Sequence, residues 1–480
     1  MTRPLRILMV CAEYQPIAKT GGLADAIAGL SRALAARGHD VRVLLPSYGG
    51  VHARLAAAPL RRLDATSVMR PAHRFYRLPH EPTAPSIYLL DSPLFTGPEI
   101  YCGDERDATR FMALADAALE LGPDIDWQPD VVHCHDWHAG LVPGLLSARR
   151  RADDSLENTR SVLTIHNIGF QGVFPDTVLA DYDDSYRHSL LGDAPSDSTV
   201  NFLRSGIERA DWLSAVSPTY AEDIQTEEYG MGLDRFLSAK SGKLTGILNG
   251  VEYEYWDPRN DPLIGHRYNV EDLSGKLANR QALVEELGIA PAEREPLIGL
   301  VSRLTWQKGI DLIVDAIPGL LSAHGCAFVL LGDGEAKLTE ALTALAQRYP
   351  DRVSFTRGYD EAFAHRIFAG SDLFLMPSRY EPCGLTQLYS LHYGSIPVVR
   401  RTGGLADTVT HFDPVTGLGT GSLFEDIDAR GLSAAVSIAL GWFQESTVWR
   451  RVVRNAMTAD FSWLKQVTLY EDMYREVLSA

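Results

Sequence analysis

Short apolar runs alternate with helix-like patterns along most of this 480-residue chain. Each run is long enough for a strand and too short for a helix. Strands that alternate with helices indicate parallel sheets covered by helices. The runs form two series, at residues 7–10, 41–45, 131–133, 162–165 and 213–216, and then at residues 297–301, 327–331, 353–355, 373–376 and 396–399. The sequence therefore predicts an α/β protein with two parallel sheets.

The expected domain boundary is a segment rich in proline and turn-forming residues. The chain is too long for one ordinary hydrophobic core and indicates two or three domains. Residues 253–268 contain Trp256-Asp257-Pro258 and Asp261-Pro262, and these turn residues interrupt both periodicities. We therefore place the first domain at 1–252 and the second at 253–460, and we predict a terminal helix within 461–480.

Charge and cysteine content limit the compartment and the partners. The formal net charge of −17 argues against nonspecific nucleic-acid binding but does not exclude a local cationic cleft. No segment approaches the roughly 20 apolar residues of a membrane span. The five cysteines are scattered without a CxxC pair, which argues against a disulfide framework or a structural zinc site. The apolar run that follows the basic N-terminus is too short for a signal core. We expect a cytoplasmic protein without nucleic-acid or membrane partners.

Two cations and one acid follow predicted strands of the second series. Arg303 and Lys308 come just after the run 297–301, and Glu381 opens a Glu-Pro-Cys-Gly turn after the run 373–376. An arginine fork and a compact lysine charge can stabilise a diphosphate leaving group without a metal. These two cations, together with an acid near a sugar, are typical of a nucleotide-sugar transferase. A surface ion-pair cluster and a solvated loop glutamate are the alternative interpretations.

A six-residue motif occurs twice. Residues 20–25 read Thr-Gly-Gly-Leu-Ala-Asp, residues 402–407 repeat them identically, and each copy follows a basic residue, Lys19 or Arg401. Each copy precedes a helix-like run, and helix N-termini approached by glycines attract anions. Chance or a shared loop architecture is the alternative. The functional interpretation is that both loops offer glycine N–H groups to a ligand, which would contact Gly22, Gly403 and Gly404.

Other nucleotide-binding motifs are incomplete. Gly242-Lys243 is followed by Leu244, so the hydroxyl of a Walker A motif is missing. Gly332-Asp333-Gly334 lacks the third glycine of a dinucleotide fingerprint. Both the ATPase and the dehydrogenase interpretations are therefore weakened.

Six motifs, in order over nearly the whole chain, resemble those of the glycogen and starch synthases. They are residues 19–25, 133–140, 164–172, 247–251, 302–309 and 379–387. The resemblance implies a GT-B fold, with two Rossmann-like domains facing a deep cleft and a C-terminal helix that crosses back to the N-terminal domain. It also implies retaining transfer of glucose to the non-reducing end of an α-1,4-glucan such as glycogen. Ala24 resembles the bacterial branch, whose donor is ADP-glucose, a substrate; no cofactor is implied.

The resemblance also assigns roles to residues. It implies that Glu381 stabilises positive charge on the donor glucose, that His166 lies beside the reacting sugar, and that Arg303 and Lys308 hold the diphosphate. Further substrate contacts are expected at Lys19, Gly22, Asp25, Asp136, Trp137, Asn249, Tyr359, Cys383, Gly384, Leu385, Thr386, Gly403 and Gly404. No metal is expected in the site.

Several alternatives remain open from the sequence. The three histidines at 133, 135 and 138 suggest a metal site as an alternative to a sugar-binding segment. A relative with another donor, such as UDP-glucose, or another acceptor would carry the same motifs. A catalytically silent glucan-binding protein belongs to a different class, and retention of the charged residues argues against it. The sequence leaves the oligomeric state, the primer preference and any regulation undetermined.

Overall fold

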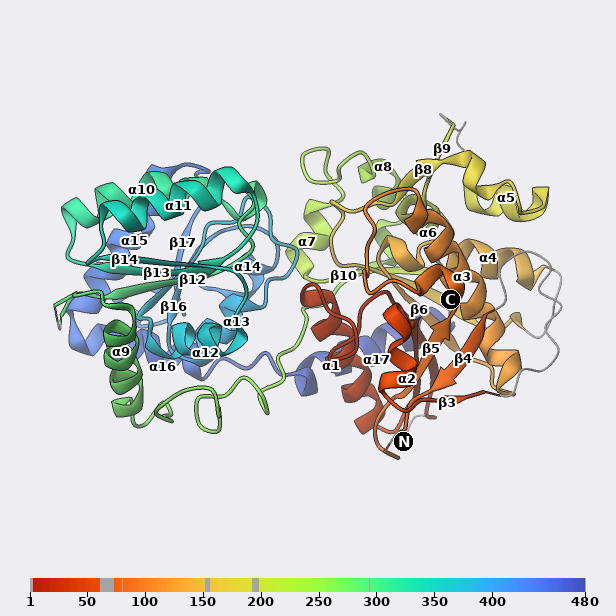
Figure 1. Cartoon of the computed structure of the whole chain (residues 1–480), viewed down its shortest axis with the longest axis horizontal. Coiled ribbons are helices and arrows are strands. Elements are labelled where there is room, and N and C mark those ends of the chain that lie inside the picture. Colours follow the sequence, from red (N-terminus) through yellow and green to blue (C-terminus); the bar gives the residue numbers. More distant parts are fainter. Residues whose placement is uncertain are drawn as a thin grey trace. The chain divides into compact units, whose positions relative to one another are not determined.

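The chain forms two compact units in the computed structural model, which describes residues 3–60, 73–79, 81–151, 156–191, 198–292 and 294–479. The first unit comprises Met1–Gly250 and Trp463–Ala480, and the second comprises Val251–Ser462 (Figure 1). The boundaries expected from the sequence, after residues 252 and 460, each lie two residues from the observed ones.

A mostly parallel sheet forms the centre of the first unit. Within the described residues its strands are β1 (Arg6–Val10), β2 (Asp40–Pro46), β3 (Ala58–Pro59), β4 (Arg74–Arg77), β5 (Ser86–Asp91), β6 (Val131–His135), β7 (Arg160–Ile165), β10 (Trp212–Ala215) and β11 (Leu244–Gly246). Their order is β11-β10-β7-β6-β1-β2-β5-β4-β3. All pairs from β11 to β5 are parallel, whereas β4 runs antiparallel to both of its neighbours. A separate hairpin joins β8 (Val173–Pro175) to β9 (Thr199–Asn201).

Helices surround this sheet. They are α1 (Gly22–Ala36), α2 (Val51–Arg54), α3 (Arg106–Asp124), α4 (Val142–Arg150), α5 (Asp184–Leu191), α6 (Phe202–Arg209), α7 (Pro218–Asp223), α8 (Asp234–Ser238) and α17 (Trp463–Ser479). Short 3-10 turns are η1 (Tyr48–Gly50), η2 (Pro93–Phe95), η3 (Trp137–Ala139), η5 (Asp176–Leu179) and η6 (Ser241–Lys243).

The last helix of the chain packs within the first unit. Helices α1 and α17 lie side by side (Figure 1), and a Cβ at Gly29 would stand only 1.9 Å from Nε1 of Trp463. The Tyr474 hydroxyl lies 2.7 Å from Nδ1 of His133 on β6, and Arg37 donates to the Glu471 carboxylate. Glycine at position 29 therefore lets the terminal helix approach closely.

The second unit has a wholly parallel sheet. Its strands are β12 (Leu297–Val301), β13 (Ala327–Gly332), β14 (Val353–Arg357), β15 (Leu373–Met376), β16 (Ile396–Arg400) and β17 (Ser422–Phe424), in the order β14-β13-β12-β15-β16-β17 within the described residues. Its helices are α9 (Ser274–Leu287), α10 (Ile310–Ala323), α11 (Ala336–Arg348), α12 (Glu361–Gly370), α13 (Thr386–His392), α14 (Gly403–Thr408), α15 (Ala429–Gln444) and α16 (Ser446–Met457), with the 3-10 turn η7 (Trp306–Lys308).

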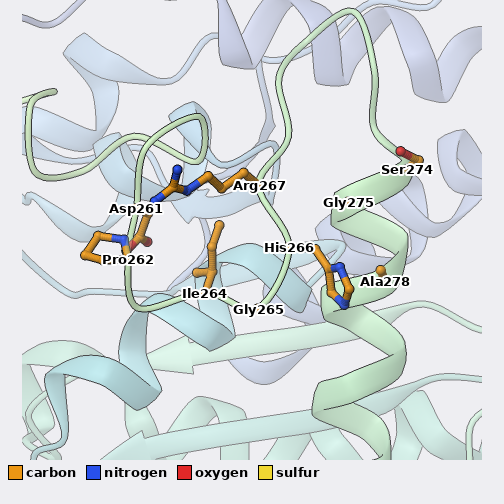
Figure 2. Close-up of a pocket in the computed structure, with 9 residues that line it drawn as sticks. All are labelled: Asp261, Pro262, Ile264, Gly265, His266, Arg267, Ser274, Gly275 and Ala278. Atoms are coloured by element: carbon orange, nitrogen blue, oxygen red, sulfur yellow. The ribbon is translucent and has the colours of Figure 1, made fainter.

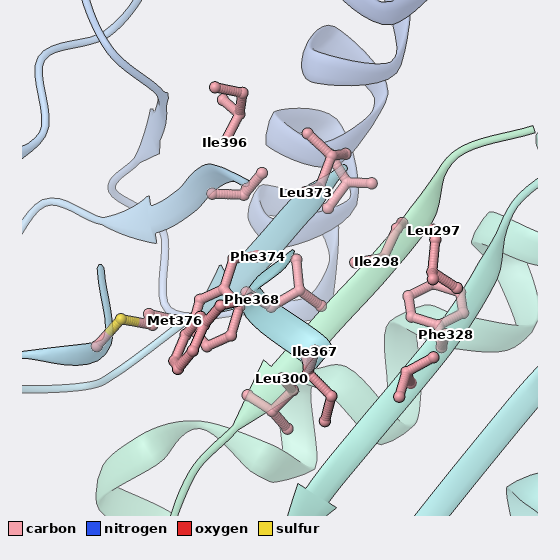
Figure 3. Packing of buried hydrophobic residues seen from close by; sticks show 14 of the residues in the cluster. Leu297, Ile298, Leu300, Phe328, Ile367, Phe368, Leu373, Phe374, Met376 and Ile396 are labelled. Carbon is pink, nitrogen blue, oxygen red and sulfur yellow. The ribbon is translucent and has the colours of Figure 1, made fainter. Parts of the chain in front are cut away.

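Continuous apolar strands build the core of this unit. Helices α10 and α11 cover one face of the sheet and α12 covers the other (Figure 1). Figure 3 shows Leu297, Ile298 and Leu300 of β12 between Phe328 of β13 and the side chains of β15 and α12. A strand covered on both faces must be apolar at nearly every position, which explains why these runs were visible in the sequence.

The strand order reverses once in each unit. The chain starts at β1 and builds outward to β2 on one side, then returns to place β6 on the other. Likewise, β12 has β13 on one side and β15 on the other. In open parallel sheets, ligands bind beyond the carboxyl ends of the strands at such a reversal. The segments at 133–140, 302–309 and 379–387 lie at the carboxyl ends of β6, β12 and β15, and the loop that carries Lys19 follows β1, so four of the six predicted motifs lie at these reversals.

Each predicted apolar run falls on a strand, with ends that agree within about two residues. Strands β5, β11 and β17, the β8–β9 hairpin and the antiparallel edge were not predicted. The expectation that the second copy of the repeated motif precedes a helical run is wrong. Helix α14 ends at Thr408, and the chain is extended from Val409. The β-branched run Thr408-Val409-Thr410 disfavours continuation of the helix.

Candidate active site

A buried ion pair joins the two motifs of the second unit. Nζ of Lys308 lies 2.5 Å from Oε2 of Glu381, and the Ser378 hydroxyl donates to the same oxygen at 2.9 Å. Glu381 is only 5% exposed. Lys308 follows β12 and Glu381 follows β15, so the pair stands where the strand order reverses. The structure thus brings together two residues that the sequence analysis had placed in one site.

Arg303 follows β12, as Lys308 does, and its charge acts on Tyr380, the residue before Glu381. Burial and the neighbouring Glu381 charge raise the pKa of the Tyr380 phenol, while the Arg303 guanidinium opposes that shift. The Arg303 side chain is exposed, and it forms no ion pair with another described residue. Arg303 is therefore a second cation after β12 that is open to an anionic ligand.

The glycines of the second motif copy, Gly403 and Gly404, pack against the backbone of the turn that carries Glu381. A Cβ at Gly403 would lie 2.1 Å from the Glu381 carbonyl oxygen, and one at Gly404 would lie 2.2 Å from that of Cys383. The N–H of Gly404 donates to the Glu381 carbonyl at 3.0 Å. This N–H is consequently not available to a ligand, and for Gly404 the expectation that it offers its N–H is corrected.

The residues after Glu381 form the start of α13. Gly384 adopts a positive φ of 73°, which favours glycine, and Thr386 is the first residue of the helix. The Gln387 amide donates to the Cys383 carbonyl and to the Thr408 hydroxyl, and so ties this turn to α14. Hydrogen bonds from Gln387 therefore fix the turn that carries Cys383 and Leu385.

Tyr359 is placed differently from these residues. It follows β14, which is separated from β12 by β13, and its side chain is 72% exposed. Its expected contact with the substrate stays a prediction.

A pocket of about 710 Å³ in the second unit lies elsewhere (Figure 2). Its lining runs from Asp261 to Arg267 and onto the first turns of α9, and it includes none of the predicted site residues. The Asp261 carboxylate is bonded to Nδ1 of His365 at 2.7 Å and to the Tyr393 hydroxyl at 2.6 Å, so it serves the fold.

In the first unit the lysine-glycine loop carries its own counter-charges. Nζ of Lys19 lies 2.8 Å from Oδ1 of Asp25, so the two predicted substrate contacts form an ion pair. The N–H groups of Thr20 and Gly21, directly before α1, donate to the Glu13 carboxylate. Sequence reasoning missed Glu13; a charged residue just beyond an otherwise apolar first strand was the available signal. Gly22 begins the helix itself.

Asp136 and His166 lie together at the ends of β6 and β7. Oδ1 of Asp136 accepts the N–H of His166 at 2.7 Å and that of Asn167 at 3.3 Å. Burial raises the pKa of Asp136 to about 7 against these two hydrogen bonds, and the Glu13 charge adds to the rise. The residue also has a φ of +56°, which is uncommon outside glycine and typical of functional sites.

The histidines of this region form hydrogen bonds with one another and with hydroxyls. Nε2 of His166 lies 3.0 Å from Nδ1 of His135, and burial lowers the pKa of the His166 imidazole to about 3. Nδ1 of His133 meets the Tyr474 hydroxyl, and its Nε2 meets the Thr164 hydroxyl at 2.6 Å. Because both ring nitrogens of His133 are engaged, His133 is not a metal ligand in this arrangement.

Trp137 and Asn249 occupy buried positions. The Trp137 ring packs against Phe111 and Phe174, with centroids 5.0 and 5.8 Å away, and a Cβ at Gly172 would come within 2.2 Å of it. The ring is therefore part of the packing around η3. Oδ1 of Asn249 is buried and has no hydrogen-bond partner among the described residues. Such an oxygen can accept a bond from a ligand.

Among the described helices, none combines the length and the apolar character needed to cross a membrane. All five cysteines are free thiols.

Both halves of the chain match known families. Residues 6–239 match the starch synthase catalytic domain, and residues 286–441 match glycosyl transferases group 1. The sucrose-phosphate synthase of Thermosynechococcus elongatus shares the fold at a TM-score of 0.63, with 20% identity over 99% of this chain and 100% of its own. These matches and the two parallel-sheet units define a two-domain glycosyltransferase of the GT-B type, as the sequence predicted.

Closer relatives define the family. The glycogen synthase of Anaeromyxobacter sp. is 42% identical over 98% of this chain and 99% of its own, and that of Anoxybacillus flavithermus is 37% identical over 99% and 98%. The catalytic domain of starch synthase IV from Arabidopsis thaliana, solved with ADP and acarbose, is 34% identical, with a TM-score of 0.89 and full coverage of both chains. The chain belongs to the glycogen and starch synthase family.

Proposed function

We propose that this protein transfers glucose from ADP-glucose to the non-reducing end of an α-1,4-glucan, with retention of the anomeric configuration and release of ADP. The observation that carries the proposal is the Lys308–Glu381 ion pair at the strand reversal of the second unit, with the exposed Arg303 on the same segment after β12. Relatives named glycogen synthase, at 37–42% identity over nearly the full chain, support the reaction. The plant relative bound to ADP and acarbose supports a nucleoside diphosphate and a glucan as ligands.

The charges suit the two ends of the breaking bond. As the bond between glucose C1 and the diphosphate oxygen breaks, its electron pair leaves with ADP, and negative charge grows on the phosphates. Arg303 and Lys308 stabilise that charge at fixed positions, which is the role of a metal in other transferases. Positive charge develops on the sugar ring, where the Glu381 carboxylate stabilises it. The acceptor hydroxyl oxygen then bonds to C1 and gives its proton to a phosphate oxygen of the departing ADP, and no cofactor takes part.

The remaining contacts follow from the same proposal. The backbone N–H groups at Gly384, Leu385 and Thr386 bind the distal phosphate or the sugar hydroxyls at the start of α13. The main chain at His166 lies beside the reacting sugar, and Asp136 holds that main chain in place. Asn249 contributes its unpartnered oxygen to a sugar hydroxyl. Tyr359 stacks on the adenine.

The compartment is part of the proposal. Free cysteines and an intracellular polymer as acceptor fit the cytoplasm.

Donor competition on a glycogen primer tests this function. Turnover is measured with ADP-glucose and with UDP-glucose, for the unmodified protein and for Glu381→Gln. We expect ADP-glucose to give the higher kcat/KM and the variant to lose turnover with either donor. Preference for UDP-glucose would identify a relative with another donor. Binding of glycogen without transfer from either nucleotide would identify a silent glucan-binding protein, and each of these results contradicts the proposal.

A further inference from the structure

Glu13 has a buried carboxylate whose two oxygens are both fully engaged. The residue follows β1 and is 3% exposed. Oε2 accepts the N–H groups of Thr20 at 2.6 Å and Gly21 at 3.2 Å. Oε1 accepts the hydroxyls of Thr20 at 2.8 Å and Tyr101 at 2.5 Å. Burial of a carboxylate is costly unless donors replace water, and here four donors do so.

These bonds determine the path of the loop that carries Lys19. The loop is closed at its base, since Tyr14 and Ala18 exchange backbone hydrogen bonds of 2.8 and 2.9 Å. Beyond Ala18, the bonds from Thr20 and Gly21 to Glu13 draw the chain back toward the end of β1. They satisfy N–H groups that a helix start leaves open, and they place negative charge where the helix favours it. The backbone on the C-terminal side of Lys19 is therefore held by one side chain.

The same carboxylate is also linked, through Tyr101, to the turn after β6. Tyr101 donates to Glu13, and its ring stacks on His138 at a centroid distance of 4.9 Å and an angle of 22°. His138 lies on η3, and this turn begins directly after Asp136. The Glu13 charge also acts on the Asp136 carboxyl. Glu13 thus connects the loop after β1 to the turn after β6. The connection runs through Tyr101, which lies 88 residues from Glu13 in the sequence, and through the stacked His138 ring.

We infer that Glu13 is a positioning residue for the glucosyl transfer. Its carboxylate holds the loop of residues 13–21 and the Tyr101 ring in the one arrangement that presents Lys19 and Asp136 to the substrate. This inference rests on the proposed function. It assigns Glu13 no contact with substrate and no proton transfer.

Two substitutions and a matched control test the inference. Glu13→Ala removes both acceptor oxygens and with them all four hydrogen bonds, whereas Glu13→Gln keeps the shape and loses the charge. Glu471→Ala is the control, because Glu471 is also buried and multiply bonded in the first unit, to Arg37 and His39. Hydrogen exchange of the peptide spanning residues 13–24 is followed by mass spectrometry, alongside kcat/KM for ADP-glucose and the melting temperature.

The expected results separate a positioning role from a merely structural one. Loop exchange should accelerate by about tenfold or more in Glu13→Ala, the scale for losing hydrogen bonds to a charged group. Glu13→Gln should fall between the Ala variant and the unmodified protein. Activity should decline in the same order, while Glu471→Ala lowers the melting temperature and leaves both loop exchange and kcat/KM unchanged.

Three outcomes would overturn the inference. Unchanged loop exchange in Glu13→Ala removes the proposed mechanical link, even if activity falls. Accelerated exchange with normal turnover shows that the loop geometry does not matter for transfer. Equal effects of Glu13→Ala and Glu471→Ala on exchange and kcat/KM show a loss of general stability only. If the unmodified protein transfers no glucose, the proposed function fails, and the exchange comparison still measures the loop separately.

Discussion

Replacement of Glu381 by glutamine is the most informative single perturbation of the second unit. Glutamine keeps the size of the side chain and can still accept hydrogen bonds from Lys308 and Ser378. It removes the negative charge. If Glu381 stabilises positive charge on glucose, the variant loses an interaction that exists mainly in the transition state. Catalysis then falls while binding of ADP-glucose changes little.

The magnitudes follow from the geometry. One preorganised electrostatic stabiliser contributes roughly 10²-fold or more to kcat, so kcat should fall by about that factor. Lys308 is 17% exposed and loses its counter-charge at 2.5 Å. A hydrogen bond to a charged group contributes about 1.5–3 kcal/mol. Since the amide oxygen retains part of it, the loss should be near the lower value. At about 2–4 °C per kcal/mol for a unit of this size, the melting temperature should fall by a few degrees.

The test measures kcat, KM and the melting temperature of Glu381→Gln on the same preparations. Glu295→Gln is the control, because Glu295 pairs with Arg352 in the same unit and lies outside the proposed site. It should lower the melting temperature to a similar extent and keep kcat. A folded Glu381→Gln protein with normal kcat would refute the role of Glu381. A change confined to KM would make Glu381 a ground-state sugar contact instead.

Three further predictions concern the second cation, metal dependence and acid. Arg303→Ala should lower kcat by roughly 10²-fold with little change in melting temperature, because an exposed cation adds little stability; near-normal turnover would show that the leaving group is held elsewhere. EDTA should leave initial rates unchanged, since fixed cations stabilise the diphosphate; a loss that a divalent ion restores would contradict this. The first unit should lose stability as the pH falls below about 6.5. Burial lowers the pKa of His133 and His138 from 6.5 to about 3. Between pH 3 and pH 6.5 the unfolded chain therefore binds more protons than the folded protein. Each histidine then contributes a slope of about 1.4 kcal/mol per pH unit to the free energy of unfolding, and Asp136, whose pKa burial raises to about 7, offsets one of these two slopes. Melting temperatures that are flat from pH 7 to pH 5 would contradict the burial of both neutral rings.

The parallel strands were predictable because burial on both faces leaves few polar positions. Strands β12 and β15 match the predicted runs at both ends. The antiparallel edge was not predictable in the same way. Strand β4 reads Arg-Phe-Tyr-Arg, and only its pairing with β5 makes it a strand. Short edge strands depend on tertiary partners more than on intrinsic preference.

The motifs identified candidate site residues, but the partners of these residues depended on folding. Lys308 and Glu381 were each predicted at a strand end, yet the ion pair between them spans 73 residues of sequence. Glu13 could be noticed as a charged residue just beyond an apolar strand, but its partner Tyr101 lies 88 residues away and could not be predicted. For Gly403 and Gly404 the sequence predicted contact with a ligand, whereas in the structure both glycines pack against the carbonyl groups of Glu381 and Cys383. Long-range hydrogen bonds of this kind have no signature in one sequence.

Transfer of carbon-13-labelled glucose from ADP-glucose to a short α-1,4-glucan tests the central claim most directly. Nuclear magnetic resonance follows the labelled anomeric carbon while ADP is released. The account predicts that the label moves from the α-linked donor to a new α-1,4 linkage at the non-reducing end, in step with ADP. A β-linked product, or release of free glucose without any growth of the glucan, would contradict it.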